Sequence, residues 1–415
     1  MSRRYFLKSL ILPLLSNPLT GCTFMNEKKH INTFGKVFDY LKDPALRVKE
    51  VGDQVMEVKG ALISGISFQG MVWKNTKFIE CDFTEAYQIK LEGLQDILFD
   101  GCRFAGIFGF GLAKRVRFNR AEVRAKTYIF TEAGSTNVVL ENCDFRSLSD
   151  NPDHWGAIAM RGEAKYVNCY AKWFDLVGEE RLDIERCKLD TVRIASGDKI
   201  NPPVTIIDTE LLGTTDMVSS HMSSLTMRNC TVGVLDLKQA HVSGDVLIEK
   251  VAGEKLLVGV VTARSMTIRN CKIVPVEGEK TAVDLAAMGI EQLRIEGCTF
   301  GDRGELRIDP GVELRDDQWT VGGPKNKLTY ITRCTMESLD ATWTESQDLR
   351  IEQCTISSAD FSNSRIGHLQ IEGSTISQKL DLRNTRIQTH SIKDLEPSKY
   401  RQVLLDGSSI KQLSI

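Results

Sequence analysis

Leu349-Arg350-Ile351-Glu352-Gln353-Cys354-Thr355-Ile356 is the clearest copy of a stretch that recurs along this chain. It alternates apolar and polar residues, reaches a cysteine, and then resumes the alternation. Other copies end at Cys102, Cys143, Cys187, Cys230, Cys271 and Cys298. Alternation with a period of two is typical of a β-strand that buries one face. Because the stretch returns at a steady interval, the sequence predicts a solenoid.

The distance between copies measures one coil of this solenoid, which comes to about 20–22 residues. Cys81 and Cys102 are one such interval apart, and so are Cys334 and Cys354. Where a copy lacks the cysteine, Thr209 and Ser374 hold its place and keep the interval. We therefore expect parallel strands in register, with like residues stacked inside. The predicted fold is an all-β solenoid, a right-handed parallel β-helix.

A pentad frame begins near Ile63 and is regular in the later part of the chain. Ala359-Asp360-Phe361-Ser362-Asn363 resembles the unit of the pentapeptide-repeat family, which is written Ala-Asp/Asn-Leu-x-x. The resemblance covers roughly residues 60–110 and 220–380. It implies four pentads to a square coil, with the small residue and the large residue two places later both pointing inward. Most units are degenerate, with Ile, Val or Phe at the centre and Cys, Leu or Ser before it.

The N-terminus carries two further resemblances. Residues 2–8, Ser-Arg-Arg-Tyr-Phe-Leu-Lys, are similar to the bacterial twin-arginine export signal at Arg3, Arg4, Phe6 and Leu7. An apolar stretch too short to span a bilayer follows. Residues 19–22, Leu-Thr-Gly-Cys, resemble a lipobox, which implies removal of residues 1–21 and lipidation of Cys22. Ordinary secretory export and a buried N-terminal helix remain alternatives.

These resemblances predict a cellular location for the protein and a division of the chain into segments. A lipid on Cys22 implies a periplasm-facing protein held to a membrane of the cell envelope, and Thr23 in place of aspartate implies the outer membrane rather than the inner one. Residues 22–50 are expected to form a tether and a short helical cap around Lys36–Lys42. A cap would cover the open edge and core of the first coil. The β-helix is expected over 51–415.

Longer intervals predict insertions where the repeat is interrupted. We expect them near 144–166, 276–292, 301–328 and 389–402, as short loops or helices. Lys280–Met288, for example, reads as helix-like because of its Ala, Leu and Met content. Insertions in a solenoid fall in loops, and loops carry function more often than coils do.

Two of these insertions hold candidate binding residues. Asp153, His154 and Trp155 combine an acid, an imidazole and an aromatic ring, and a second set comprises Asp316, Asp317 and Trp319. Paired carboxylates could serve glycoside chemistry, and an aromatic ring could stack on a sugar or anchor a protein. Ordinary polar loops are the alternative at both places. Glu179–Asp183 is a third acidic group, on a strand, where a solvated face is the plainer interpretation.

Cysteine usage argues against a metal centre. Ten of the eleven cysteines occupy one repeat position, which predicts a ladder of buried thiols, with some disulfides as the alternative. No Cys-x-x-Cys and no Cys-x-x-x-His spacing is present, so we expect no metal. No phosphate-binding or dinucleotide-binding glycine motif occurs either, so no cofactor is expected.

Charge and motifs narrow the function without fixing it. With 53 basic and 55 acidic side chains the chain lacks the basic surplus of a nucleic-acid binder. We predict a non-enzymatic, lipid-anchored module that binds a protein or envelope partner, with toxin immunity as a narrower version. The alternative is a carbohydrate-active or sugar-binding β-helix, such as a polysaccharide lyase or hydrolase. The DNA mimicry of some cytoplasmic pentapeptide-repeat proteins would require that the N-terminus is no export signal.

Overall fold

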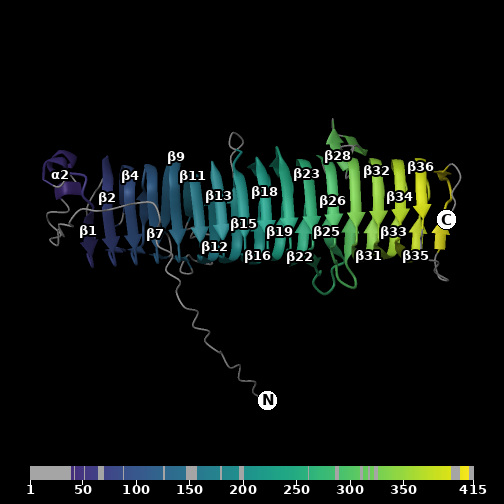
Figure 1. Cartoon of the computed structure of the whole chain (residues 1–415), viewed down its shortest axis with the longest axis horizontal. Helices are drawn as coiled ribbons and strands as arrows, with labels where there is room; N and C mark the ends of the chain where they lie inside the picture. The colour runs from purple at the N-terminus through teal and green to yellow at the C-terminus, as the bar shows by residue number, and fades with distance from the viewer. Residues whose placement is uncertain are drawn as a thin grey trace, which may run out of the picture.

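The computed structural model describes 39–41, 43–50, 52–63, 70–86, 88–124, 127–145, 157–177, 180–195, 201–259, 261–285, 289–308, 312–315, 318–321, 326–393 and 402–410. Within these ranges the chain forms one long rod of stacked parallel strands, with its N-terminal end capped by helix (Figure 1). The rod is a parallel β-solenoid that matches a right-handed, pentapeptide-repeat-like β-helix, as predicted.

One series of strands, here called face A, runs the whole length of the rod, each strand pairing in parallel with the next. Its members are β1 (Met56–Lys59), β2 (Met71–Ile79), β4 (Gln88–Asp100), β7 (Leu112–Asn119), β9 (Tyr128–Glu141), β11 (Ala157–Val167), β13 (Arg181–Glu185), β15 (Pro203–Ile207), β18 (Ser224–Arg228), β21 (Asp245–Glu249), β23 (Thr262–Arg269), β26 (Gly289–Glu296), β30 (Asn326–Thr332), β32 (Glu345–Glu352), β34 (Arg365–Glu372), β36 (Arg386–Lys393) and β38 (Ser409–Ile410).

A second parallel series, face B, follows the cysteine corner of each coil. Its members are β3 (Asp82–Phe83), β5 (Arg103–Phe104), β8 (Glu122–Val123), β10 (Asp144–Phe145), β12 (Tyr170–Val177), β14 (Lys188–Ala195), β16 (Glu210–Asp216), β19 (Thr231–Asp236), β22 (Ala252–Leu257), β24 (Lys272–Ile273), β25 (Thr281–Asp284), β27 (Glu305–Arg307), β31 (Thr335–Asp340), β33 (Thr355–Asp360), β35 (Thr375–Asp381) and β37 (Gln402–Leu404).

Short strands complete the sides between the two faces. β6 (Ile107–Gly109) lies between β4 and β9, and β17 (His221–Met222) pairs with β20 (His241–Val242), which leads to β23. Only β28 (Val312–Arg315) and β29 (Gln318–Val321) leave the solenoid among the described strands, as an antiparallel hairpin. In Figure 1 this hairpin projects from one long edge of the rod.

The core is a set of columns that follow the strand register. One column on face A runs from Phe78 through Phe99, Phe118, Leu140, Tyr166, Ile184, Ile206, Met227, Ile248, Ile268, Ile295, Ile331 and Ile351 to Ile371. Every member is buried, and the burial pattern along the strands alternates. The apolar alternation of the sequence is therefore the inward face of each coil.

Cysteines form a second column, at the corner between the faces. Cys81, Cys102 and the other eight repeat cysteines are buried and free, which confirms the predicted thiol ladder. Cys354 donates a hydrogen bond from Sγ to the carbonyl oxygens of Ile331, 3.6 Å away in the preceding coil, and of Glu352, 3.3 Å away. The residue before the cysteine adopts a positive φ, as at Asn229 (53°) and Gln353 (53°). This turn directs the thiol inward.

The N-terminal cap has a clear local origin. Asp43 accepts hydrogen bonds from the amides of Ala45 and Leu46, both at 3.0 Å, at the start of helix α2 (Pro44–Glu50). A carboxylate N-cap followed by proline is a strong start signal for a helix. Residues 39–41 are also helical, and Tyr40 and Leu41 belong to the buried core. Helix is thus described at 39–41 and 44–50, and the rest of the expected Lys36–Lys42 cap lies outside the described residues.

Regular strands run into several of the expected insertions. The helix-like stretch Lys280–Met288 is a strand over its described residues Thr281–Asp284, where β25 pairs with β22 and β27. Ladder pairing on both sides outweighs the helical propensity of its alanine and leucine. The hairpin lies inside the expected 301–328 insertion, and β36 continues to Lys393, so strand occupies the first part of 389–402.

Candidate functional site

Most charged side chains on the described strands serve the solenoid itself. On face A, Glu249 lies between Arg228, 3.1 Å away, and Arg269, 2.8 Å away. Its hydrogen bond with Arg269 lowers the pKa of the Glu249 carboxyl. Arg115 donates two hydrogen bonds to the carboxylate of Asp96, at 2.5 and 2.7 Å, and these bonds lower the pKa of the Asp96 carboxyl. Side chains that are paired in this way neutralise each other and are poorly suited to bind a charged ligand.

A row of aspartates at the end of face B strands also has a structural role. Asp340, Asp360 and Asp381 are adjacent in register. Each accepts a hydrogen bond from the backbone amide two residues later, at 2.9 to 3.1 Å. Aspartate stabilises a turn in this way, so the row fixes the corner rather than forming a catalytic carboxylate pair.

Asp381 is the most strongly perturbed carboxylate of this row. Its side chain is fully buried, and both Arg383 (2.6 Å) and Lys379 (2.9 Å) contact it. Burial alone would raise the pKa of the Asp381 carboxyl, but the two cations together lower it well below the usual range. The group is held as a structural anion.

Most of the residues singled out from the sequence lie outside the described part of the chain. The export and lipidation residues Arg3, Arg4, Phe6, Leu7 and Cys22 are among them. So are Asp153, His154, Trp155, Asp316 and Asp317. Trp319 is placed only by its backbone, in β29 opposite Leu314 of β28.

The third acidic group can be placed in part. Asp183 on β13 accepts a hydrogen bond from Nε of Arg181 at 2.8 Å, and its side chain is only 14% exposed, so at this residue the strand face is ion-paired but largely shielded from solvent. Glu179 lies outside the described residues. Among the residues that the structure describes, no group of three or more His, Cys, Asp or Glu side chains could hold a metal ion. No described helix has the length and apolar character needed to cross a bilayer.

Two neighbouring loops on face B enclose a pocket of about 350 Å³. One loop is 274–280, between β24 and β25, and the other is 301–303. Val274 and Val276 are 42% and 45% exposed, so this pocket combines apolar side chains with the charged rim of the same loops. In Figure 1 loops near β25 project from the edge opposite the hairpin. This part of the rod, 274–321, contains both this pocket and the antiparallel hairpin.

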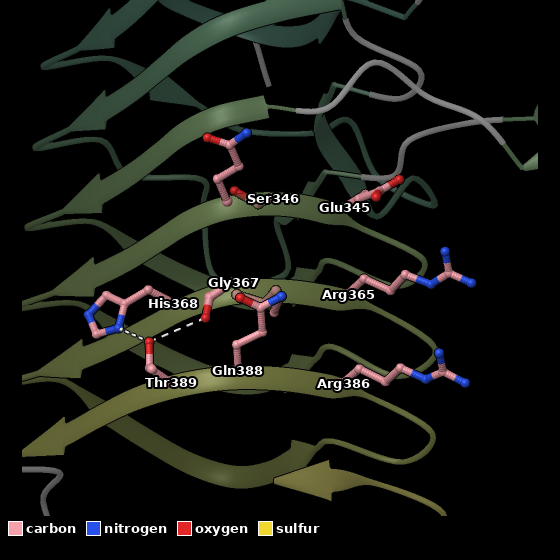
Figure 2. Close-up of a pocket in the computed structure, with 10 residues that line it drawn as sticks. Glu345, Ser346, Arg365, Gly367, His368, Arg386, Gln388 and Thr389 are labelled. Carbon is pink, nitrogen blue, oxygen red and sulfur yellow. Dashed lines mark hydrogen bonds between the residues drawn. The ribbon is translucent and has the colours of Figure 1, made fainter. Parts of the chain in front are cut away.

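A larger groove, about 690 Å³, lies on face A near the C-terminal end, here called the C-terminal groove. It is formed by the first halves of β32, β34 and β36, and its lining includes Gln347, Arg365, His368, Arg386, Gln388 and Thr389. Figure 2 shows Arg365 and Arg386 side by side at one end and His368 with Thr389 at the other.

The groove floor depends on close approach of two strands. A Cβ atom on Gly367 would lie 2.5 Å from the carbonyl oxygen of Gln347, so a larger residue would push β34 away from β32. Nδ1 of His368 lies 2.9 Å from Oγ1 of Thr389, which donates to the carbonyl oxygen of Gly367 at 3.3 Å. These contacts fix the imidazole beside the groove.

Sequence reasoning missed this groove. No motif of the sequence marks its residues, and Arg365 and Arg386 are far apart along the chain. Their separation is one coil, so Arg365 and Arg386 are direct neighbours in register. Writing the sequence in rows of one coil would have brought the two arginines together.

Comparisons with known proteins add little to this picture. No protein-family model and no curated protein matches the chain. Among solved structures, the chain is similar to QnrB1, a plasmid-mediated fluoroquinolone resistance protein, with 16% identity. The match covers 57% of this chain and 91% of that chain, with a TM-score of 0.15. At this TM-score the similarity has no bearing on function.

Proposed function

We propose that the chain is an exported, lipid-anchored β-solenoid that binds a protein partner in the cell envelope and catalyses no reaction. The observation that carries this proposal is the pair of irregular features within residues 274–321, the two-loop pocket and the antiparallel hairpin. Several described ion pairs elsewhere tie coil to coil. A rigid rod that presents a few loops is suited to recognition.

The two-loop pocket supports a protein partner in particular. Val274 and Val276 are exposed apolar side chains, and the loop that carries them is tied to the rod by the ion pair between Lys255 and Glu279, 2.5 Å apart. An apolar centre with a charged rim is the usual anatomy of a protein interface. Glu277 and Arg303 supply that rim.

The expected address rests on the N-terminal motifs. Residues 2–8 and 19–22 support export and lipidation of Cys22, and the outer membrane is the expected location. A periplasm-facing rod on a lipid anchor would hold its loops at a distance from the bilayer. Toxin immunity is the narrower version of this role.

The decisive experiment is capture of partners from native envelopes by the full chain and by a Val274→Lys/Val276→Lys variant. A partner retained by the natural protein and lost by the variant supports the proposal. Val218→Lys is the matched control, because Val218 is 41% exposed but lies in a regular corner. Equal capture by all three proteins would contradict the role of the two-loop pocket.

Separate experiments test the membrane anchoring and the absence of catalysis. Cys22→Ala should release the protein from membranes, and a variant that stays membrane-bound would contradict lipid anchoring. If the natural protein turned over a polysaccharide, and Asp153→Ala, His154→Ala or Asp317→Ala abolished that turnover, the carbohydrate-active alternative would replace this proposal.

A further inference from the structure

The C-terminal groove contains two arginines in direct register. Arg365 begins β34 and Arg386 begins β36, and the two residues are paired across the parallel ladder. Both are exposed, and Figure 2 shows their side chains extending to the same side. Like charges on directly opposed residues repel each other, so this arrangement costs the fold stability.

No carboxylate in the described part of the chain lies within 4.0 Å of either guanidinium, although Glu345 precedes Arg365 in register. Some arginines elsewhere on the rod hold an acid of a neighbouring coil. Arg264, for example, holds Asp245 through contacts of 3.0 and 2.5 Å. Arg193, which lies outside the groove, stands in register between Asp175 and Asp216. Arg365 and Arg386 instead stand beside each other in register, and neither has an acid at ion-pair distance within the described ranges.

The remaining lining of the groove supplies hydrogen-bond donors. Gln347 and Gln388 offer amide N–H donors. The hydroxyl proton of Thr389 goes to the carbonyl oxygen of Gly367, so Nδ1 of His368 donates to Thr389, and these contacts hold the imidazole at the edge of the groove. Glu345 is the one carboxylate among the lining residues, so the lining as a whole is rich in donors and positive in charge.

We propose that the C-terminal groove binds a phosphoryl or sulfo group. A guanidinium offers parallel N–H donors in a planar fork, and a single fork suits a carboxylate. Two adjacent forks can instead contact separate oxygens of one tetrahedral dianion. That anion would place negative charge between Arg365 and Arg386 and so remove the repulsion between their two guanidinium groups.

Trp343 gives a reason to look for a sugar attached to this group. It lies at a corner two residues before Glu345, is 50% exposed, and adopts a φ of +58°. The equivalent corners of the next two coils carry Asn363 and Asn384, which tolerate that conformation better. An exposed tryptophan in a strained position, two residues before Glu345 of the groove lining, suits stacking on a sugar ring.

The test is calorimetric titration of the full chain with inorganic phosphate, sulfate and glucose 6-phosphate, at low and high salt. We expect saturable binding that weakens as salt rises, because the arginines are exposed and therefore screened. Arg365→Ala and Arg386→Ala should each weaken binding at least about tenfold, and Arg365→Lys should restore only part of it. Arg193→Ala is the matched control and should bind as the natural protein does.

Several outcomes would overturn the proposal. Absence of saturable binding by the natural protein is one, and an equal loss in Arg193→Ala is another. All variants alter exposed side chains, so circular dichroism should stay unchanged, and the midpoint of thermal unfolding of Arg365→Ala and Arg386→Ala should stay the same or rise, because each removes one of two like charges. If the arginine variants unfold, competition between phosphate and glucose 6-phosphate on the natural protein decides instead, since one site requires mutual displacement.

Further binding measurements distinguish an anionic group on a sugar from one on a lipid headgroup. Tighter binding of glucose 6-phosphate than of phosphate, lost in Trp343→Ala, supports a sugar-borne group. Binding to vesicles containing phosphatidic acid but not to phosphatidylcholine alone supports a lipid headgroup. Vesicle binding that persists in the Arg365→Ala/Arg386→Ala variant would contradict the groove as its site. This proposal does not depend on export or on the two-loop pocket.

Discussion

The two ends of the rod fill the same interior column with different side chains. At the N-terminal end, Phe78, Phe99 and Phe118 stack with ring centroids 5.2 and 4.9 Å apart. At the C-terminal end the same column carries isoleucine, including Ile351 and Ile371. Both sets are fully buried, and both belong to parallel strands in register.

The difference shows that the residues above and below, rather than a consensus unit, determine which side chain fits at an inward position. At the two ends rings stack on rings and isoleucines on isoleucines, while the middle of the column mixes Leu140, Tyr166 and Met227 with isoleucine. The aromatic end needs extra space at its corners. A Cβ on Gly109, for instance, would lie 2.6 Å from the ring of Phe130. A glycine in that coil is therefore part of the aromatic packing.

The largest expected effect is truncation of the aromatic column. Phe99 contacts the rings of Phe78, Phe104, Phe110 and Phe118. Phe99→Ala should lower the free energy of unfolding by about 3–5 kcal/mol, because it removes a large ring and leaves a cavity. Hydrogen exchange should increase in β2, β4 and β7 and stay unchanged in β34, since each coil of a solenoid contacts only its neighbours. Uniform exchange along the rod would contradict this local coupling.

A swap in the other direction tests whether the aliphatic end can accept a ring. Ile351→Phe places a larger side chain between Ile331 and Ile371. Overpacking should cost about 1–3 kcal/mol, measured by denaturant unfolding. Ile351→Val is the control and should cost about 0.5–1.5 kcal/mol. A phenylalanine variant as stable as the natural protein would show that column volume is not matched layer by layer.

The buried Asp381 should make the C-terminal end sensitive to acid. Because its pKa is lowered in the folded state, its contribution is present above the unfolded pKa of about 4 and is lost as the pH falls further. Asp381→Asn should cost about 1–3 kcal/mol at neutral pH and progressively less below pH 4. Unfolding measured across pH checks this, and a penalty that does not vary with pH would contradict it.

The smallest effect is expected at the cysteine corner. Cys354→Ser should cost about 1 kcal/mol or less, because Ser374 already occupies the next step of the column. The hydroxyl of Ser374 donates to the carbonyl oxygens of Glu372 and Ile351, at 3.1 and 3.4 Å, in the pattern of the thiol. Cys102→Ser makes the same change at the aromatic end, and a much larger cost there would show that the corner depends on its neighbours.

The fold was readable from the sequence because its determinants are local and periodic. The apolar alternation around Cys354 indicated the inward face, and the constant interval between repeat cysteines indicated the parallel register. Local propensity was misleading at Thr281–Asp284, where pairing with the coils on either side decides the conformation. The aromatic column could also have been read from Phe78, Phe99 and Phe118, one coil apart.

The candidate site was less readable because it depends on contacts between coils. Arg365 and Arg386 form a pair only once the coil length has been applied. Trp343 became notable only through its positive φ, which no sequence pattern reveals. The two-loop pocket, by contrast, lies largely within the insertions expected at 276–292 and 301–328, and Val274 and Pro275 of its lining precede the first of them.

The thiol column has a further consequence for how the rod can be followed in time. Burial raises the pKa of the Cys230 thiol, and the side chain is 2% exposed. A reagent that modifies thiolates therefore reacts with Cys230 only after the surrounding coil has opened. Since most coils carry such a thiol, the order in which the thiols become modified reports the order in which the coils open.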